Sequence, residues 1–539
     1  MKNKCNWLAA VVCLAIFNCS EAQLKFIVDD FEGFSRGSAD LKKNGIFAYG
    51  NCSATIEQEG AEERKRHSID YLGQRYITLS KKKAPGYGGW GKGIGLQVEL
   101  DASADYLNFY IHQPQSANLL FKIELQEDDN NDQVYKAEQD DSWLHQFEIK
   151  SQAGNEWQLI SVPLADFKDM NGGGDGVFNC SYKGGKLLTL IMSLAGTEQE
   201  NVFSMDFICF SKGALRDIVA NTEASCSLGL WSKEEKPADF TAIGSTFEKL
   251  AGAEKKLAVI HFFQPFALDG GTYQNNYPSI EKVNKIIAEG YTPLITLENH
   301  FVNVNARMKQ PNLYSITEGH MDEFFTKWAG QIKQIKGVVL VRILHEFNGN
   351  WYPWCIANND RNPALLVQAF RHIRTIFKTA GAGNVKFVWC PNSMSVPQEP
   401  WNFIMDAYPG DEYVDLVGLD IYNGAGQESS VWRSFRKEGI ENYFILTDRL
   451  PAKPLLVCET ASRERGAAEG EGQTKAQWIA QLSQALQSDM RAVKLLTWFN
   501  EKSTFKINSS PSSKKAFQDH IVKDGYFRSS NQQLLSLFK

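Results

Sequence analysis

The pattern of apolar and polar positions divides the chain into two parts that meet near residue 226. Before this point, short segments such as 96–100, 106–111 and 157–162 alternate apolar and polar residues, as half-buried strands do. Turn-forming clusters separate these segments, and convincing amphipathic helices are missing. We therefore predict an all-β sandwich or jelly roll over residues 23–212.

After residue 226, apolar runs alternate with segments of helical periodicity. Eight strand–helix units over residues 226–539 predict an α/β fold, a (β/α)8 TIM barrel that follows a linker at 213–225. The candidate strands are 227–231, 257–263, 293–297, 338–344, 385–389, 414–419, 454–457 and 492–498.

Two of these candidate strands lead into a glutamate. The fourth is followed by His345 and Glu346, then by a turn and a group of aromatic residues, and the seventh is followed by Glu459. Because the carboxyl ends of barrel strands meet at one mouth, we expect both glutamates to face the same site. Two carboxylates suit glycoside hydrolysis, and flat aromatic rings pack against sugars.

Composition narrows the class of partner and the compartment. A net charge of −6 argues against nucleic acid, which requires a basic face. Residues 1–22 resemble a signal peptide, with Lys2 and Lys4 before an apolar run that is too short to span a membrane. We predict cleavage before Gln23 and a secreted monomer without a membrane span. Lipoprotein attachment through Cys19 is the weaker alternative.

The cysteines do not indicate a metal site. Seven of them follow residue 22, at wide spacing and without a CxxC motif, so zinc is not expected. Cys355 and Cys390 follow two strand ends, and either a disulfide or two buried thiols fits their positions. We expect the catalytic part to require no cofactor.

Four segments of the second part resemble glycoside hydrolase family 26, namely 342–354, 387–392, 408–422 and 457–460. The resemblance implies a (β/α)8 barrel and a retaining mechanism. It also implies that Glu346 is the acid/base and Glu459 the nucleophile, that His345 holds a substrate hydroxyl, and that Tyr422 donates a hydrogen bond to Glu459. Trp351 and Trp498 would form the floor and wall of the cleavage subsite.

Other residues near the strand ends are candidates for sugar binding. Trp354 follows the fourth strand closely and is expected to form part of a sugar platform. Trp389 and Phe263 fit either a sugar contact or the core. His300, after the third strand, fits either a subsite or an ordinary surface position.

The first part resembles β-sandwich carbohydrate-binding modules, especially family 11, in segments 28–32, 162–167 and 205–208. Asp29, Asp30, Glu32 and Asp206 offer oxygens for one structural calcium ion, but we favour the alternative that they are solvated surface carboxylates.

We therefore expect a secreted endo-acting β-glycanase whose partner is a β-linked polysaccharide. The family resemblance implies β-1,4-mannan first, with mixed-linkage β-1,3-1,4-glucan or xylan as alternatives. A non-catalytic carbohydrate-binding or adhesion protein is the alternative from another class, which loss of either glutamate would favour.

Overall fold

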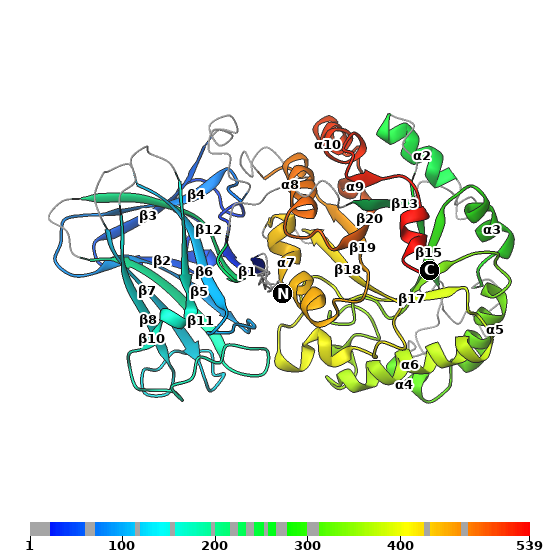
Figure 1. Cartoon of the computed structure of the whole chain (residues 1–539), viewed down its shortest axis with the longest axis horizontal. Coiled ribbons are helices and arrows are strands. Elements are labelled where there is room, and N and C mark those ends of the chain that lie inside the picture. The colour runs from blue at the N-terminus through cyan, green and yellow to red at the C-terminus, as the bar shows by residue number, and fades with distance from the viewer. Residues whose placement is uncertain are drawn as a thin grey trace, which may run out of the picture.

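The computed structural model contains two domains, a β-sandwich and a barrel (Figure 1). It describes residues 22–59, 71–113, 119–150, 157–195, 200–215, 225–232, 242–252, 257–265, 277–298, 312–424, 432–464 and 473–538. Residues 1–21 of the expected signal peptide, and His300, lie outside the described residues. Within the described residues, no helix is long and apolar enough to cross a membrane.

The N-terminal domain is built from two antiparallel sheets, as the alternating pattern predicted. The β12 sheet has the order β3-β4-β12-β6-β9 with β1 also paired to β12, and the β7 sheet has the order β10-β8-β7-β11-β5-β2. Phe109 of the first sheet stacks on Phe121 of the second, with ring centroids 5.8 Å apart, so the core lies between the sheets. The strands are β1 (Gln23–Asp29), β2 (Ile46–Tyr49), β3 (Cys52–Gln58), β4 (Arg75–Lys81), β5 (Gly88–Leu96), β6 (Asp105–His112), β7 (Leu119–Asp128), β8 (Ser142–Ile149), β9 (Gln158–Pro163), β10 (Lys168–Asp169), β11 (Lys186–Leu194) and β12 (Asn201–Lys212).

The second domain is a closed parallel barrel, so the predicted (β/α)8 fold is confirmed. Strand β13 pairs with both β20 and β14, which closes the ring, and the short β21 (Phe527–Arg528) adds to β13 outside it. The barrel strands are β13 (Cys226–Ser232), β14 (Val259–Pro265), β15 (Thr292–Glu298), β16 (Val339–Arg342), β17 (Val385–Trp389), β18 (Leu416–Asn423), β19 (Leu455–Ser462) and β20 (Val493–Asn500).

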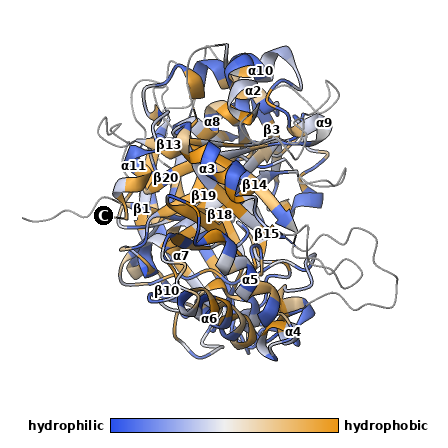
Figure 2. Cartoon of the chain, turned by 90° about the vertical axis from the view of Figure 1, so that its right-hand side faces the viewer, coloured by the Kyte–Doolittle hydropathy of each residue, from blue (hydrophilic) through white to orange (hydrophobic). Residues whose placement is uncertain are grey.

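Helices surround the barrel, whose strands in Figure 2 are mostly hydrophobic. The described helices are α2 (Ala242–Ala251), α3 (Ile280–Ala288), α4 (Leu313–Thr317), α5 (Asp322–Ile332), α6 (Pro363–Thr379), α7 (Phe435–Arg449), α8 (Lys475–Gln487), α9 (Lys502–Phe505), α10 (Pro511–Phe517) and α11 (Gln532–Ser536). Leu534 of α11 belongs to the same buried cluster as Val259, Leu294 and Leu340, which lie in the first halves of their strands. Helix α11 therefore covers the end of the barrel opposite the carboxyl ends of the strands.

The barrel interior has an apolar layer below a polar one. Leu294, Leu340, Leu416, Leu456 and Leu495 belong to one buried interior cluster. Because side chains alternate along a strand, the positions two residues further on also point inward. These positions include Thr296 and Arg342, which are completely buried and hydrogen-bonded to each other. The polar layer therefore lies directly beneath the barrel mouth.

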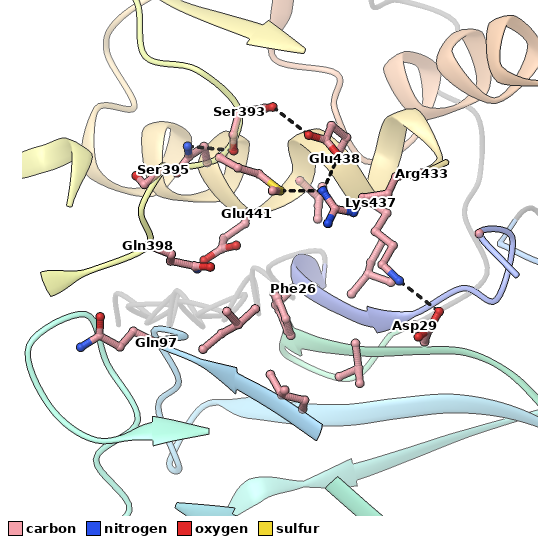
Figure 3. A pocket seen from close by; sticks show the side chains of 18 of the residues that line it. Phe26, Asp29, Gln97, Ser393, Ser395, Gln398, Arg433, Lys437, Glu438 and Glu441 are labelled. Carbon is pink, nitrogen blue, oxygen red and sulfur yellow. Dashed lines mark hydrogen bonds and ion pairs between the residues drawn. The ribbon is translucent and has the colours of Figure 1, made fainter. Parts of the chain in front are cut away.

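The two domains share a polar contact between β1 and α7. The carboxylate of Asp29 lies 2.8 Å from Nζ of Lys92 in its own domain and 3.0 Å from Nζ of Lys437 in the barrel. Ser434 at the start of α7 donates a hydrogen bond of 2.6 Å to Asp30. A cavity of about 290 Å³ adjoins this contact, with Asp29 and Lys437 facing each other across the domain boundary (Figure 3). Its lining includes neither Glu346 nor Glu459.

Apolar packing also joins the domains. Tyr182 stacks on Phe403 of the barrel with ring centroids 4.2 Å apart, and its hydroxyl donates to Glu441 of α7 at 2.6 Å. Arg436 of α7 lies over the ring of Tyr71, 5.1 Å from its centroid. A single buried apolar cluster includes residues from both domains. The two domains therefore pack as one molecule, although their sequence patterns differ.

Candidate active site

Glu346 lies in a strained turn after β16. The backbone dihedral φ is 50° at Leu344 and 51° at Glu346, in the left-handed region that residues with side chains rarely adopt. The backbone N–H of Glu346 donates to the carbonyl of Cys390 at 2.8 Å, and the indole N–H of Trp354 donates to the carbonyl of His345 at 2.7 Å. These bonds hold a conformation that costs roughly 1–3 kcal/mol per residue. The turn also explains why β16 ends at Arg342, before the predicted end at residue 344.

A β-bulge directs Glu459 into the barrel. In the pairing of β18 with β19, Leu419 is opposite Val457, whereas the next residue, Asp420, is opposite Glu459. Cys458 is thus the extra residue of a bulge, and inward alternation shifts by one position. Cys458 belongs to the interior cluster, and Glu459 points inward as well, against Arg342. β19 continues to Ser462, so Glu459 lies within the strand and not after its predicted end at 457.

Two donors hold the carboxylate of Glu459. The hydroxyl of Tyr422 donates to Oε2 at 2.6 Å, and Nη2 of Arg342 donates to Oε1. Such hydrogen bonds hold the carboxylate in a fixed orientation. The position of Glu459 fits the predicted role of nucleophile, with both of its oxygens oriented by donors.

Arg342 is completely buried and connects the polar layer to this carboxylate. Nη1 lies 2.8 and 2.6 Å from the two oxygens of Asp420, and Nε donates to Thr296 at 2.9 Å. Burial opposes a charge on the guanidinium, but the carboxylates of Asp420 and Glu459 outweigh it and hold the pKa of Arg342 above its usual value. One cation thus serves two buried carboxylates.

Glu346 has a different environment. Its side chain is almost fully buried, and the indole N–H of Trp351 donates to Oε2 at 2.7 Å. Burial, followed by the negative charge of Glu459, raises the pKa of Glu346 to about 7. A carboxyl group with this pKa is protonated in a substantial fraction of molecules near neutral pH. Glu346 is therefore suited to act as an acid next to a nucleophilic carboxylate.

His345 joins a short chain of side chains beside Glu346. Its Nε2 lies 3.2 Å from the hydroxyl of Tyr352, which in turn donates to Glu298 at 3.2 Å. Phe263 lies nearby, with its ring centroid 6.5 Å from that of His345. These side chains come from strands β14 and β15 and from the turn after β16, so they line one side of the mouth.

The aromatic residues expected to bind sugar have different positions in the structure. Trp351 is 45% exposed beside Glu346 and offers an accessible ring face. Trp354 is buried and stacks on Tyr352 at 4.4 Å, so it supports the turn and does not present a platform.

The prediction that Trp498 forms a wall of the subsite is wrong. Trp498 is 1% exposed and lies on the outer face of β20, where it packs edge-on against Trp478 of α8 and Phe517 of α10. Phe499, the next residue, points inward and packs against Phe263 and Tyr422, with ring centroids 6.1 and 5.9 Å apart. Inward and outward positions alternate along a strand, so only one of two adjacent aromatic residues can face the site.

Trp389 also faces outward, and a sugar contact does not fit its position. It is buried between Phe347 and Tyr408, whose ring centroids lie 5.1 and 5.2 Å from its own. Its indole N–H donates a hydrogen bond of 3.2 Å to the carbonyl of Ala407. This is the core position that the sequence left open as the alternative.

The cysteines and the expected calcium ligands also have clear positions. Cys355 and Cys390 are buried free thiols, which decides against a disulfide between them. The carboxylate of Asp29 contacts two lysines, Lys92 and Lys437. Oε1 of Glu32 accepts hydrogen bonds from the backbone N–H groups of Gln74 and Arg75, at 2.6 and 2.7 Å. Asp29, Asp30, Glu32 and Asp206 are all buried, so the favoured prediction of solvated surface carboxylates at these positions is wrong.

The sequence reasoning gave no role to Arg342, Asp420, Glu298 or Phe499. Arg342 had one usable signal, because a single charged residue in an otherwise apolar strand must find a buried partner. The partner itself, Asp420, lies on a different strand and is visible only in the fold.

Comparison with known proteins agrees with this description of the barrel. Residues 302–437 match the family model described as Glycosyl hydrolase family 26. Endoglucanase H of Acetivibrio thermocellus is 29% identical over 309 residues, covering 56% of this chain and 31% of the relative. A mannan endo-1,4-beta-mannosidase of Bacillus subtilis is 30% identical over 117 residues, covering 20% of this chain and 31% of the relative. The chain thus spans about a third of each relative's length (31%).

The chain is also similar to solved structures. The Podospora anserina GH26-CBM35 beta-(1,4)-mannanase aligns with a TM-score of 0.42 and 14% identity, covering 92% of this chain and 100% of that one.

Proposed function

The barrel contains a glycosyl hydrolase family 26 domain, and we propose that the protein is a retaining endo-β-glycanase that hydrolyses β-1,4-mannan. The observation that carries the proposal is the pair of carboxylates at the barrel mouth. Glu459 is held by the donors of Arg342 and Tyr422, whereas burial and the charge of Glu459 raise the pKa of Glu346. The different environments suit Glu459 to the role of nucleophile and Glu346 to that of acid/base, the two roles that a retaining hydrolase requires.

In the first step, Glu459 attacks the anomeric carbon while Glu346 protonates the leaving glycosidic oxygen. The bond between the anomeric carbon and this oxygen breaks, and a glycosyl ester forms on Glu459. Tyr422 and Arg342 orient the two oxygens of Glu459 before the attack. The leaving chain then departs with the proton of Glu346.

In the second step, Glu346 takes a proton from water, which attacks the anomeric carbon and releases Glu459. Esterification of Glu459 removes the negative charge that raised the pKa of Glu346 in the free enzyme. The pKa of Glu346 therefore falls when its role changes from acid to base. The hydrogen bond from Trp351, which favours the ionised form, supports the same change.

Accessible rings at the mouth support a polysaccharide as the substrate. Trp351 is partly exposed, and Phe263 and Phe499 are partly buried around the same opening. A ring face packs against the apolar face of a pyranose. We expect the protein to be secreted, as residues 1–22 indicate, and the N-terminal domain to bind polysaccharide.

A mixed-linkage β-glucan is the second candidate substrate. Of the two relatives described above, the endoglucanase matches over 309 residues and the mannosidase over 117. The choice depends on contacts to one axial or equatorial hydroxyl group, and β-mannan remains our first proposal.

A reducing-sugar assay on galactomannan, glucomannan and barley β-glucan tests the proposal. We expect release of reducing ends and a rapid fall in viscosity with galactomannan, and retention of configuration in the first product by NMR. Activity on barley β-glucan alone would replace mannan by the second candidate. Inactivity on all three polymers, or an inverted product, would contradict the proposal.

A further inference from the structure

Three carboxylates gather at one edge of the N-terminal domain. Glu127 is near the end of β7, and Asp129 and Asp141 are at the two ends of the loop that joins β7 to β8. One oxygen from each lies within 4.8 Å of the others. The site is separate from the barrel mouth and from the contact around Asp29.

This cluster has little to neutralise its charge. Glu127 and Asp141 have no exposed surface, and the described residues include no lysine or arginine paired with any of the three carboxylates. Buried like charges at this distance destabilise one another unless a cation lies among them.

Two oxygens of the cluster also lack a donor. Oδ1 of Asp141 is buried and accepts no hydrogen bond from the described part of the chain, and the same is true of Oδ1 of Asp129. A buried carboxylate oxygen without a partner is costly, and a metal ion supplies such a partner. The fully buried Asp141 therefore points to a ligand independently of the clustering.

Gly174 closes the cluster on one side. A Cβ atom at this position would lie 2.2 Å from Oδ1 of Asp141 and 2.4 Å from Oδ2 of Asp129. The residue also has φ of 54°, which disfavours a side chain. The loop at Gly174 thus packs its bare backbone directly against two carboxylate oxygens.

We propose that Glu127, Asp129 and Asp141 bind a Ca²⁺ ion. All donors are oxygens, which favours a hard cation over zinc or copper. Calcium accepts six to eight oxygens in a flexible arrangement, so irregular loops suit it better than Mg²⁺, which demands octahedral geometry. The ion would tie the loop between β7 and β8 to the loop that contains Gly174. It would stabilise the N-terminal domain without taking part in hydrolysis.

Calcium titration of the full chain, freed of metal with EDTA, tests this proposal. We expect one equivalent of Ca²⁺ to bind by calorimetry, with a dissociation constant of about 10⁻⁴–10⁻³ M, the range of extracellular modules. The melting temperature should rise by a few degrees with Ca²⁺ and by less with Mg²⁺. Tb³⁺ luminescence excited through tryptophan gives a local readout, because the indole N–H of Trp143 donates to Glu127 at 3.0 Å.

Asp141→Asn should abolish calcium binding and the terbium signal. Because it removes like-charge repulsion, the metal-free variant should melt at the same temperature as the metal-free parent, or higher. Asp129→Asn, at the less buried member, provides a second test should the first variant not fold. The matched control is Asp132→Asn, since Asp132 lies on the same loop but pairs with Lys136.

The proposal fails if the parent protein neither binds Ca²⁺ nor melts at a higher temperature with it. It also fails if both cluster variants keep the full response, or if Asp132→Asn loses it to the same extent. These outcomes do not depend on glycosidase activity, so the catalytic proposal and the calcium proposal are tested separately.

Discussion

Nη2 of Arg342 donates a hydrogen bond to Oε1 of Glu459, from a guanidinium that has no exposed surface. Nη1 of the same guanidinium bonds both oxygens of Asp420. The candidate nucleophile is therefore part of a buried ionic group that extends to the centre of the barrel. We therefore expect stability and catalysis to depend on the same cation.

We expect Arg342→Met to destabilise the protein as well as inactivate it. Removing the cation leaves Asp420 and Glu459 buried without compensation, and breaking a buried pair in this way costs about 3–5 kcal/mol. Urea denaturation measures the loss. Arg36→Met is the control, because the exposed Arg36 contacts Glu57 at 3.4 Å and should contribute less than about 1 kcal/mol. Equal losses for the two variants would contradict the role of Arg342.

Alanine variants of the two glutamates should differ on an activated aryl glycoside. Glu459→Ala lacks the nucleophile and should be inactive on every substrate, by several orders of magnitude. Glu346→Ala lacks only the proton donor, which a good leaving group does not need, so it should still form the glycosyl ester. A pre-steady-state burst of aryl alcohol distinguishes the variants. A burst from Glu459→Ala would reverse the assignment.

The pH dependence of kcat/KM should reflect the raised pKa of Glu346. This group must be protonated to act as the acid, so activity should fall as the pH rises through about 7. Trp351→Phe removes a donor to the ionised form, and the pKa of Glu346 should rise further. Since such a hydrogen bond contributes about 0.5–1.5 kcal/mol, the basic limb should move up by roughly half a unit to one unit.

The control for this shift is Trp401→Phe, since Trp401 contacts Arg361 and not Glu346. It should leave the basic limb in place. A basic limb well below pH 7 in the parent enzyme, or a downward shift with Trp351→Phe, would contradict the role of the indole donor.

The barrel could be predicted from the sequence because eight apolar runs alternate with helical periodicity, and strand tips of a barrel always share one mouth. The same rule indicated that Glu346 and Glu459 would meet. The predicted resemblance to family 26 is confirmed for residues 302–437. The resemblance of the first part to carbohydrate-binding modules stays a prediction.

Local register could not be predicted. A bulge at Cys458 decides that Glu459 faces inward, and alternation along β20 decides that Phe499, not Trp498, does so. Both outcomes depend on pairing between strands that are distant in sequence. The contact between the two domains could not be predicted either, because apolar residues that pack against another domain look like ordinary core residues in the sequence. Asp29 illustrates this, since its partner Lys437 is in the barrel.

Asp29 should make the protein lose stability as the pH falls into the acidic range. Burial opposes its charge, but Lys437 and Lys92 outweigh burial and hold the pKa of Asp29 far below its usual value. A depressed pKa in the folded state means that this contribution is fully present above the unfolded pKa of about 3.9 and is lost as the pH falls below it. Asp29→Asn should therefore lower the free energy of unfolding at pH 7.

The same variant should also show a weaker loss of stability between about pH 5 and pH 2 than the parent, because the titrating group is gone. Thermal or urea unfolding across this range measures both effects. Asp166→Asn, at an exposed carboxylate, is the control and should follow the parent. If Asp29→Asn leaves stability at pH 7 unchanged, the ion pairs that join β1 to α7 do not hold the two domains together.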